Sequence, residues 1–462
     1  MMMTRQSGQT LLASALALLM AGCAMIPAYE APPVDVPTSW KNAQGGSALS
    51  IDPQWWRAFG SAELDGLMQA ALTDNPGLRA GMHRIEQSRA ALKIAGASML
   101  PTLGASGGAS RTRTDPPNAG ADYRTGLSAG LAIGYELDLF GANRAGIEAS
   151  RANLAGTHYA QEALTLATLG DVAQAYFTVL NNRERLRLNQ ETLDNAREIL
   201  RLIDARYSAG AVSALELSQQ RAALATAEAA HAALKQQEDN ALNALAVLLG
   251  QAPQGFAVAS VSLTGVPVPA IGAGQPSLLL ERRPDIRAAE AALRAANANI
   301  GAARAAFFPN ITLGLNSSWS ATAFGDPLTS AIALASSLSA PVFAGGRLEG
   351  GLEQATARQQ ELAETYRQTM LAAFREVEDA LIAVDTATVR ESRLRVAMNE
   401  ARRAYRLSQQ LYDAGAADFQ TMLNAQSSFF SAQDSHAQAL YARLAAAIDL
   451  YRALGGGWTS GG

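Results

Sequence analysis

The segment LSAGLAIGYELDL, residues 127–139, decides the fold because apolar residues alternate in it with small or acidic ones. Every second residue from Leu127 to Leu139 is apolar, and the residues between them are Ser, Gly, Ala, Glu and Asp. A period of two predicts a strand with one face suited to lipid and the other to water. The segment ITLGL, residues 311–315, has the same period, and each segment adjoins a very long Ala-rich helical pattern. This combination predicts a membrane barrel mounted on a coiled-coil stalk.

The composition fits thin, closely packed helices. Of the 462 residues, 48% are hydrophobic but only 6% are aromatic, so Ala supplies much of the apolar count. The 37 basic and 41 acidic residues give a net charge of −4, and no run of Lys or Arg stands out. We therefore expect neither nucleic acid nor an anionic membrane surface as a partner.

The N-terminus has the pattern of an export signal. Arg5 is the only charge in residues 1–22, and the apolar run Leu11–Met20 is too short to span a bilayer. We expect residues 1–22 to be removed, which leaves a mature chain with a charge of about −5. No later segment approaches 18 uninterrupted apolar residues, so we expect no membrane-spanning helix. A chain of this kind would cross a bilayer with strands.

The end of this signal resembles a bacterial lipobox. It reads Met20-Ala-Gly-Cys23, with Met where Leu is usual, and Cys23 is the only cysteine of the chain. The alternative, a buried thiol, does not suit this position, so we expect a covalent lipid on Cys23 and no other cofactor. Ala24 stands where an Asp would retain a lipoprotein in the inner membrane, and the resemblance therefore indicates the outer membrane of a Gram-negative bacterium.

The chain contains one structural unit twice. Tyr207-Ser-Ala-Gly210 recurs 205 residues later as Tyr412-Asp-Ala-Gly415, and Asn75-Pro76 recurs 208 residues later as Arg283-Pro284. Such offsets indicate two tandem repeats. The predicted domains are an extended tail (23–60), a first repeat (61–249), a linker (250–280), a second repeat (281–454) and a Gly-rich tail (455–462). Within the repeats the pattern predicts strands at 102–112, 126–140, 310–320 and 328–340, and helices at 142–209, 214–249, 346–413 and 418–454.

The long helices carry coiled-coil seams. Apolar residues follow 3-4 spacing from Val172 to Tyr207, and the same spacing returns from Val377 to Tyr412. The helix 142–209 would be about 100 Å long at about 1.5 Å per residue. Asn182 and Asn189 lie in the first seam and admit two interpretations, as pore or ligand groups or as residues that fix the register.

Four strands are too few to close a barrel with a lumen. An unpaired strand edge in hydrocarbon leaves backbone groups unsatisfied, so the chain is predicted to oligomerise, and three copies would supply about twelve strands. The alternative is a soluble four-stranded sheet on helices, which does not explain why hairpins recur at the same place in both repeats.

Several motifs together identify a family. They are Trp55-Trp56, Phe59, Asn75-Pro76, Glu281–Ile286 (ERRPDI), Pro341–Arg347 (PVFAGGR) and Leu454–Trp458 (LGGGW). Together they resemble the outer-membrane factors of resistance-nodulation-division (RND) efflux systems, the lipoprotein (NodT-type) branch of the TolC-like family. The resemblance implies a homotrimer with a twelve-stranded barrel, a periplasmic α-helical tunnel, a periplasmic adaptor protein and an inner-membrane RND transporter. It also places the turns at Gly210 and Gly415, with Tyr207 and Tyr412, at the periplasmic tip that meets the adaptor.

The resemblance also suggests candidates for a gate. Family members often place acids around a constriction at the tip, and here Asp413, Asp418 and Glu216 lie near the Gly turns. Thr421 and Asn424 are neutral where some relatives carry acids. The alternative is that these carboxylates are solvated turn residues. For Arg282-Arg283 the two interpretations are an anion site and an anchor at a helix start.

No catalytic or metal-binding pattern is recognisable in the sequence. The four histidines lie on separate predicted helices without metal-ligand spacing, and no Gly-rich phosphate loop follows a strand. We therefore expect no enzyme and no metal, and energy for export from a partner. Three functions remain: a passive exit duct of a tripartite efflux pump for small toxic compounds, a duct for type I protein secretion, and a lipid-anchored coiled-coil scaffold without a pore.

Overall fold

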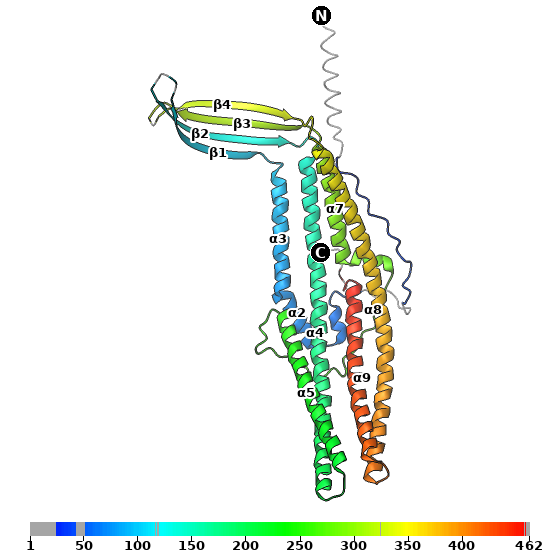
Figure 1. The fold of residues 1–462 in the computed structure, drawn as a ribbon. Helices are drawn as coiled ribbons and strands as arrows, with labels where there is room; N and C mark the ends of the chain where they lie inside the picture. Colours follow the sequence, from blue (N-terminus) through cyan, green and yellow to red (C-terminus); the bar gives the residue numbers. More distant parts are fainter. Residues whose placement is uncertain are drawn as a thin grey trace. The chain divides into compact units, whose positions relative to one another are not determined.

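The structure is a computed structural model that describes residues 25–42, 51–115, 117, 120–323, 325–456 and 458. The chain divides into two compact units. The first consists of Met1–Pro33, Arg84–His158 and Ala288–Gln368, and the second consists of Val34–His83, Tyr159–Arg287 and Thr369–Gly462. The predicted signal peptide and Cys23 lie outside the described residues. In chain order the elements are η1 (Trp55–Phe59), α2 (Ala62–Asp74), α3 (Pro76–Ala97), β1 (Thr102–Thr114), β2 (Asp122–Leu137), α4 (Ala142–Ser208), α5 (Ala214–Leu248), η2 (Pro276–Leu278), α6 (Leu279–Arg282), α7 (Pro284–Ala305), β3 (Asn310–Ala321), β4 (Thr329–Ser339), α8 (Arg347–Asp413) and α9 (Phe419–Ala453). The strands and the longer helices are labelled in Figure 1, and η1 and η2 are 3₁₀ turns.

The first unit contains one antiparallel sheet in the order β1-β2-β3-β4 (Figure 1). Its register pairs Leu131 with Ala105 on one side and with Ser317 on the other. Because side chains alternate across a strand, this register keeps each parity on one face through the whole sheet. In the described chain β1 and β4 are edge strands, so the sheet is open at both ends of its order.

β2 differs from the predicted strand 126–140 at both ends, since it runs from Asp122 to Leu137. The strand ends at Leu137 because the Asp138 side chain binds the N-terminal end of α4. Its carboxylate accepts hydrogen bonds from the backbone N–H groups of Asn143 (3.1 Å) and Arg144 (3.0 Å), which are free donors at the start of α4. The other strands and the four longest helices begin and end within two residues of the predicted positions.

Small residues let the helices of the first unit pack closely. Ala149 of α4 clusters with Ala295 and Ala298 of α7, and a side chain at Gly156 would come within 3.4 Å of the Cβ of Ala291. The extended N-terminal segment lies against α7, where Asn297 Nδ2 donates to the carbonyl of Pro27 (2.8 Å). Close helix packing is what the Ala-rich composition predicted.

The second unit has an aromatic core between α4, α9 and η1. Trp55 and Phe59 are almost fully buried, and they pack against Phe177 and Tyr451. The predicted extended tail 23–60 was therefore wrong at its end, because burial of these rings folds residues 55–59 into η1. The predicted linker 250–280 likewise ends early, in η2 and α6.

Burial confirms the second coiled-coil seam in full and the first as far as Ile203, because Tyr207 at its predicted end is exposed. Every residue at 3-4 spacing from Val377 to Tyr412 is buried or half-buried, while the residues between them are almost all exposed. In the first seam Asn182 is 5% exposed, and Asn189 Oδ1 lies 3.2 Å from His231 Nδ1 of α5. The burial of Asn182 and the contact of Asn189 with the partner helix α5 favour the interpretation that these residues fix the register.

One stretch of α4 is apolar enough, by composition, to cross a membrane. Half of its most apolar window of 18 residues is buried inside the protein. Packing in the helical core accounts for this hydropathy, as it does for core helices of other proteins.

Candidate functional site

The sheet has two chemically different faces. The register places the even-numbered residues of β1, β2 and β3 on the same side as the odd-numbered residues of β4, and we call this side the small face. It consists of Gly, Ala, Ser, Thr and Asn apart from Asp122, Arg124 and Glu136. The apolar face, of opposite parity, aligns Leu103, Ile133, Leu315 and Leu334 across all four strands. An apolar outer band and a polar interior are the pattern of a membrane barrel.

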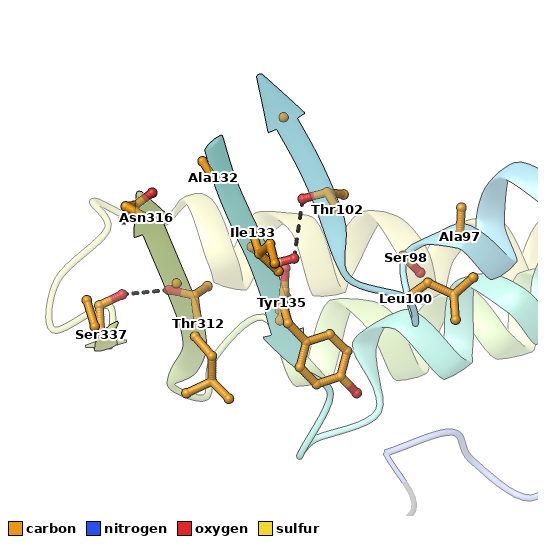
Figure 2. A pocket seen from close by; sticks show the side chains of 16 residues that line it. Ala97, Ser98, Leu100, Thr102, Ala132, Ile133, Tyr135, Thr312, Asn316 and Ser337 are labelled. Carbon is orange, nitrogen blue, oxygen red and sulfur yellow. Dashed lines mark hydrogen bonds between the residues drawn. The ribbon is translucent and has the colours of Figure 1, made fainter. Parts of the chain in front are cut away.

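A hollow of about 630 Å³ lies over the small face near α3. Figure 2 shows Thr102, Thr312 and Ser337 among the residues that line it. Thr102 Oγ1 donates to the carbonyl of Gly134 (3.3 Å), and the hydroxyls of Thr312 and Ser337 lie 2.6 Å apart. Because its side chains are mostly hydroxyls or the hydrogen of glycine, this face is polar and has few large side chains.

The two Gly turns are built identically. Gly210 and Gly415 have φ values of 73° and 72°, and each amide donates to the carbonyl of its tyrosine, Tyr207 or Tyr412 (2.9 and 3.0 Å). A side chain at either glycine would meet nothing within 4 Å, so the backbone angle and not space requires glycine here. The repeat in the sequence therefore corresponds to a repeated helix C-cap.

The tyrosines beside these turns differ in their surroundings. Tyr207 is 44% exposed, whereas Tyr412 packs against Phe419, with ring centroids 5.7 Å apart. The guanidinium of Arg206 lies 5.7 Å above the Tyr412 ring and contacts its hydroxyl at 3.5 Å. Burial, partly offset by the hydrogen bond from Arg206, raises the pKa of Tyr412. The structure thus brings the C-terminal ends of α4 and α8, the long helices of the two repeats, into contact.

One of the three gate candidates caps a helix, and a second lies in the first turn of another helix. The Asp418 carboxylate is the N-cap of α9 and accepts from the backbone N–H of Thr421 (2.7 Å). Hydrogen bonds from the side chain and then the backbone of Thr421 lower the pKa of Asp418. Glu216 follows the N-cap Ser213 of α5, whose hydroxyl accepts from the Glu216 backbone N–H (3.3 Å). Asp413 is the exposed last residue of α8. A gate role for these acids stays a prediction.

Sequence reasoning missed the polar contacts that join the α4–α5 pair of helices to α9 of the second repeat. Arg185 of α4 forms a bidentate pair with Asp434 of α9 (2.5 and 3.3 Å), and Gln219 of α5 donates to Gln420 of α9 (2.7 Å). Arg185 precedes the seam residue Leu186. Coiled coils place interhelical ion pairs beside the seam, so charges flanking the seam were the available signal.

Arg283 is an anchor, as the helix-start interpretation predicted. Its Nε and Nη2 donate to Asp285 (3.0 and 2.6 Å), Nη2 also pairs with Glu376 of α8 (2.7 Å), and Nη1 donates to the carbonyl of Ala453 in α9 (3.1 Å). Burial by itself would lower the pKa of Arg283, but the two carboxylates outweigh it and raise the pKa. Each of its three nitrogens contacts a group within the protein, which favours the anchor over an anion site.

A second network fixes the linker to α4. The Glu63 carboxylate accepts from the backbone N–H groups of Ala259 (2.5 Å) and Ser260 (3.0 Å) and from the Tyr176 hydroxyl (3.3 Å). Arg183 donates to the carbonyls of Val258 and Ser260 (2.7 and 2.6 Å). Burial raises the pKa of Glu63, but the hydrogen bonds that it accepts from Ser260, Ala259 and Tyr176 outweigh burial, so the pKa is lowered overall.

Among the described residues, no three acidic, His or Cys side chains are grouped to hold a metal ion.

Comparison with known proteins covers almost the whole chain. The family described as outer membrane efflux protein matches residues 67–251 and 275–456. The pyoverdine export outer membrane protein OpmQ of Pseudomonas aeruginosa is 39% identical over 453 residues, with 96% of each protein covered. The CmeC outer membrane channel of Campylobacter jejuni matches with a TM-score of 0.85 and 25% identity, covering 95% of this chain and 96% of that one. The open state of the Neisseria gonorrhoeae MtrE outer membrane channel matches with a TM-score of 0.84 and 31% identity, covering 94% and 98%.

Proposed function

The chain belongs to the outer membrane efflux protein family, and from this membership we propose that three copies form the exit duct of a tripartite pump. An RND transporter in the inner membrane loads the duct through a periplasmic adaptor protein. The duct itself is passive, the transporter selects the cargo and supplies the energy, and no residue of the chain needs to be catalytic.

The fold class, the efflux function and the location predicted from the sequence are confirmed by the similar proteins. The protein is mainly α with a membrane β-barrel and two tandem repeats, and it is an efflux channel of the outer membrane that extends into the periplasm. These similarities favour efflux over the protein-secretion duct and the scaffold without a pore.

The two-faced, open-edged sheet is the observation that carries the proposal. In lipid, the free backbone groups of β1 and β4 must pair with strands of other copies, because each unpaired group costs several kcal/mol. With four strands per chain, three copies give about twelve strands, with the apolar face outward and the small face lining a bore.

We extend the proposal to both ends of the molecule. Cys23, which lies outside the described residues, carries the lipid that anchors the N-terminus in the outer membrane. The Gly210 and Gly415 turns contact the adaptor. This contact is supported by the repeated cap geometry, because each chain has two similar, exposed turns that a partner could bind in the same way.

The experiment compares two arginine substitutions on adjacent residues of β3. Leu315 lies on the apolar face between Ile133 and Leu334, and Asn316 lies on the small face between Ala132 and Ala333. Arg on a lipid face costs about 2–4 kcal/mol near the middle of the bilayer. We expect Leu315→Arg to be lost from outer-membrane fractions, and Asn316→Arg to insert as a trimer with reduced conductance in planar bilayers.

Two results would overturn the proposal. One is wild-type protein, purified in detergent, that is monomeric and gives no conductance in planar bilayers. The other is Leu315→Arg that inserts and conducts as the wild type does. The adaptor is tested separately, by cross-linking from a cysteine at Ala211 or Ala416 beside the two turns, and capture of no periplasmic protein would remove that part of the proposal.

A further inference from the structure

Glu136 is the one carboxylate on the small face that no cation neutralises within the described chain. It lies at the last small-face position of β2, paired across the strands with Thr312, and it is one of the residues that line the hollow over this face. The other charges of this face, Asp122 and Arg124, pair with each other at 3.2 Å at the far end of β2. The small face therefore carries one uncompensated negative charge per chain.

A hydrogen bond orients this carboxylate. Asn310 Nδ2 at the start of β3 donates to Glu136 Oε1 (2.9 Å). The nearby Asp138 is different, because its side chain is 5% exposed and pairs with Arg144 at 3.2 Å. An amide donor fixes the direction of a carboxylate and carries no charge of its own, so this hydrogen bond does not neutralise Glu136.

We infer that Glu136 forms a ring of three carboxylates where the barrel begins, and that this ring makes the bore favour cations over anions. The inference rests on the proposed trimeric channel with the small face inside. In the second repeat, the corresponding position 203 residues later is Ser339, which is neutral, so each chain contributes one charge to the ring. Charged rings of this kind set ion selectivity in wide pores.

Barrel geometry sets the size of the effect. Twelve strands about 4.8 Å apart and tilted by about 40° give a backbone radius of about 12 Å, which places the carboxylates about 10 Å from the axis. At about 0.1 M salt, three such charges enrich monovalent cations about twofold on the axis and deplete anions about twofold. At about 1 M salt the Debye length is about 3 Å and the enrichment disappears.

The test measures reversal potentials of single channels under a salt gradient near 0.1 M. Glu136→Gln keeps the acceptor for Asn310 and removes the charge, and we expect the cation-to-anion permeability ratio to fall about two- to fourfold. Glu136→Asp should retain the ratio. Glu30→Gln, which removes the same charge from the N-terminal segment and not from the sheet, is the matched control and should leave the ratio unchanged.

A cysteine variant provides a second readout in the same channel. Because Cys23 is the only native cysteine, Glu136→Cys can be modified by methanethiosulfonates of either charge. The anionic reagent should restore cation preference, and the cationic reagent should reverse it. Channels that conduct normally but show the same ratio in wild type and Glu136→Gln, or Glu136→Cys that is insensitive to both reagents, would overturn the inference. Absence of conductance in the wild type would instead contradict the channel itself.

Discussion

Replacing Arg283 tests whether the most diagnostic motif of the sequence is a structural clamp. The Arg283 side chain is 9% exposed, and it joins α9 and α8 to the start of α7 through Ala453, Glu376 and Asp285. Removing one partner of a fully buried ion pair costs about 3–5 kcal/mol. Here Asp285 and Glu376 are 40% and 44% exposed, so water would solvate them and reduce the penalty to about 2 kcal/mol.

The carbonyl of Ala453 adds to this penalty, because it would lose its donor from Arg283 inside the protein at a cost of about 1 kcal/mol. For Arg283→Met we therefore expect a loss of about 3 kcal/mol in the free energy of unfolding. Arg283→Lys keeps the charge but loses the two-pronged contact with Asp285, so its loss should be about half as large, on the order of 1.5 kcal/mol.

The assay is urea unfolding of detergent-purified protein, followed by the helical circular dichroism signal. Protein and detergent concentrations are held fixed, because the stability of an oligomer depends on them. Arg358→Met is the control, since the Arg358–Glu361 pair is exposed on both sides and should contribute less than about 0.5 kcal/mol. A free energy of unfolding for Arg283→Met within about 1 kcal/mol of the wild-type value would refute the clamp.

Three further predictions concern single residues. The pKa of Glu63 is lowered in the folded protein, so its carboxylate stabilises the fold above the ordinary value of 4.5 and this contribution is lost as the pH falls through the lowered pKa. Melting temperatures of wild type and Glu63→Gln should accordingly differ at pH 6 and converge toward pH 3; a constant difference would contradict this. Gly415→Ala should cost about 1–2 kcal/mol in urea unfolding because of its positive φ, whereas Gly350→Ala, inside α8 with open space around it, should cost nothing; equal effects would refute the argument. Asp418→Asn keeps a good N-cap and removes the charge, so a changed single-channel conductance would support a gate role and an unchanged one would discard it.

Short-range pattern was enough to predict the regular elements. The alternation around Leu131 predicted a strand because side chains alternate across any strand, and the 3-4 spacing from Val377 predicted a seam because a helix repeats every 3.6 residues. The recurrence of Gly210 as Gly415 predicted equivalent turns, since both require the same backbone angle. The need for other copies followed from arithmetic, because four strands cannot close in lipid.

The sequence by itself determined the elements, their order along the chain and the two faces of the sheet, because each depends on residues that are close together in the sequence. Only the tertiary structure decided which polar groups meet: Arg206 with Tyr412, Arg185 with Asp434 and Arg283 with Glu376. It likewise assigned Asp138 to the start of α4 and, among the residues that the structure describes, placed no cation beside Glu136. A periodic pattern shows which side of an element is buried, but partners 90 to 250 residues apart in the chain are fixed by packing in three dimensions.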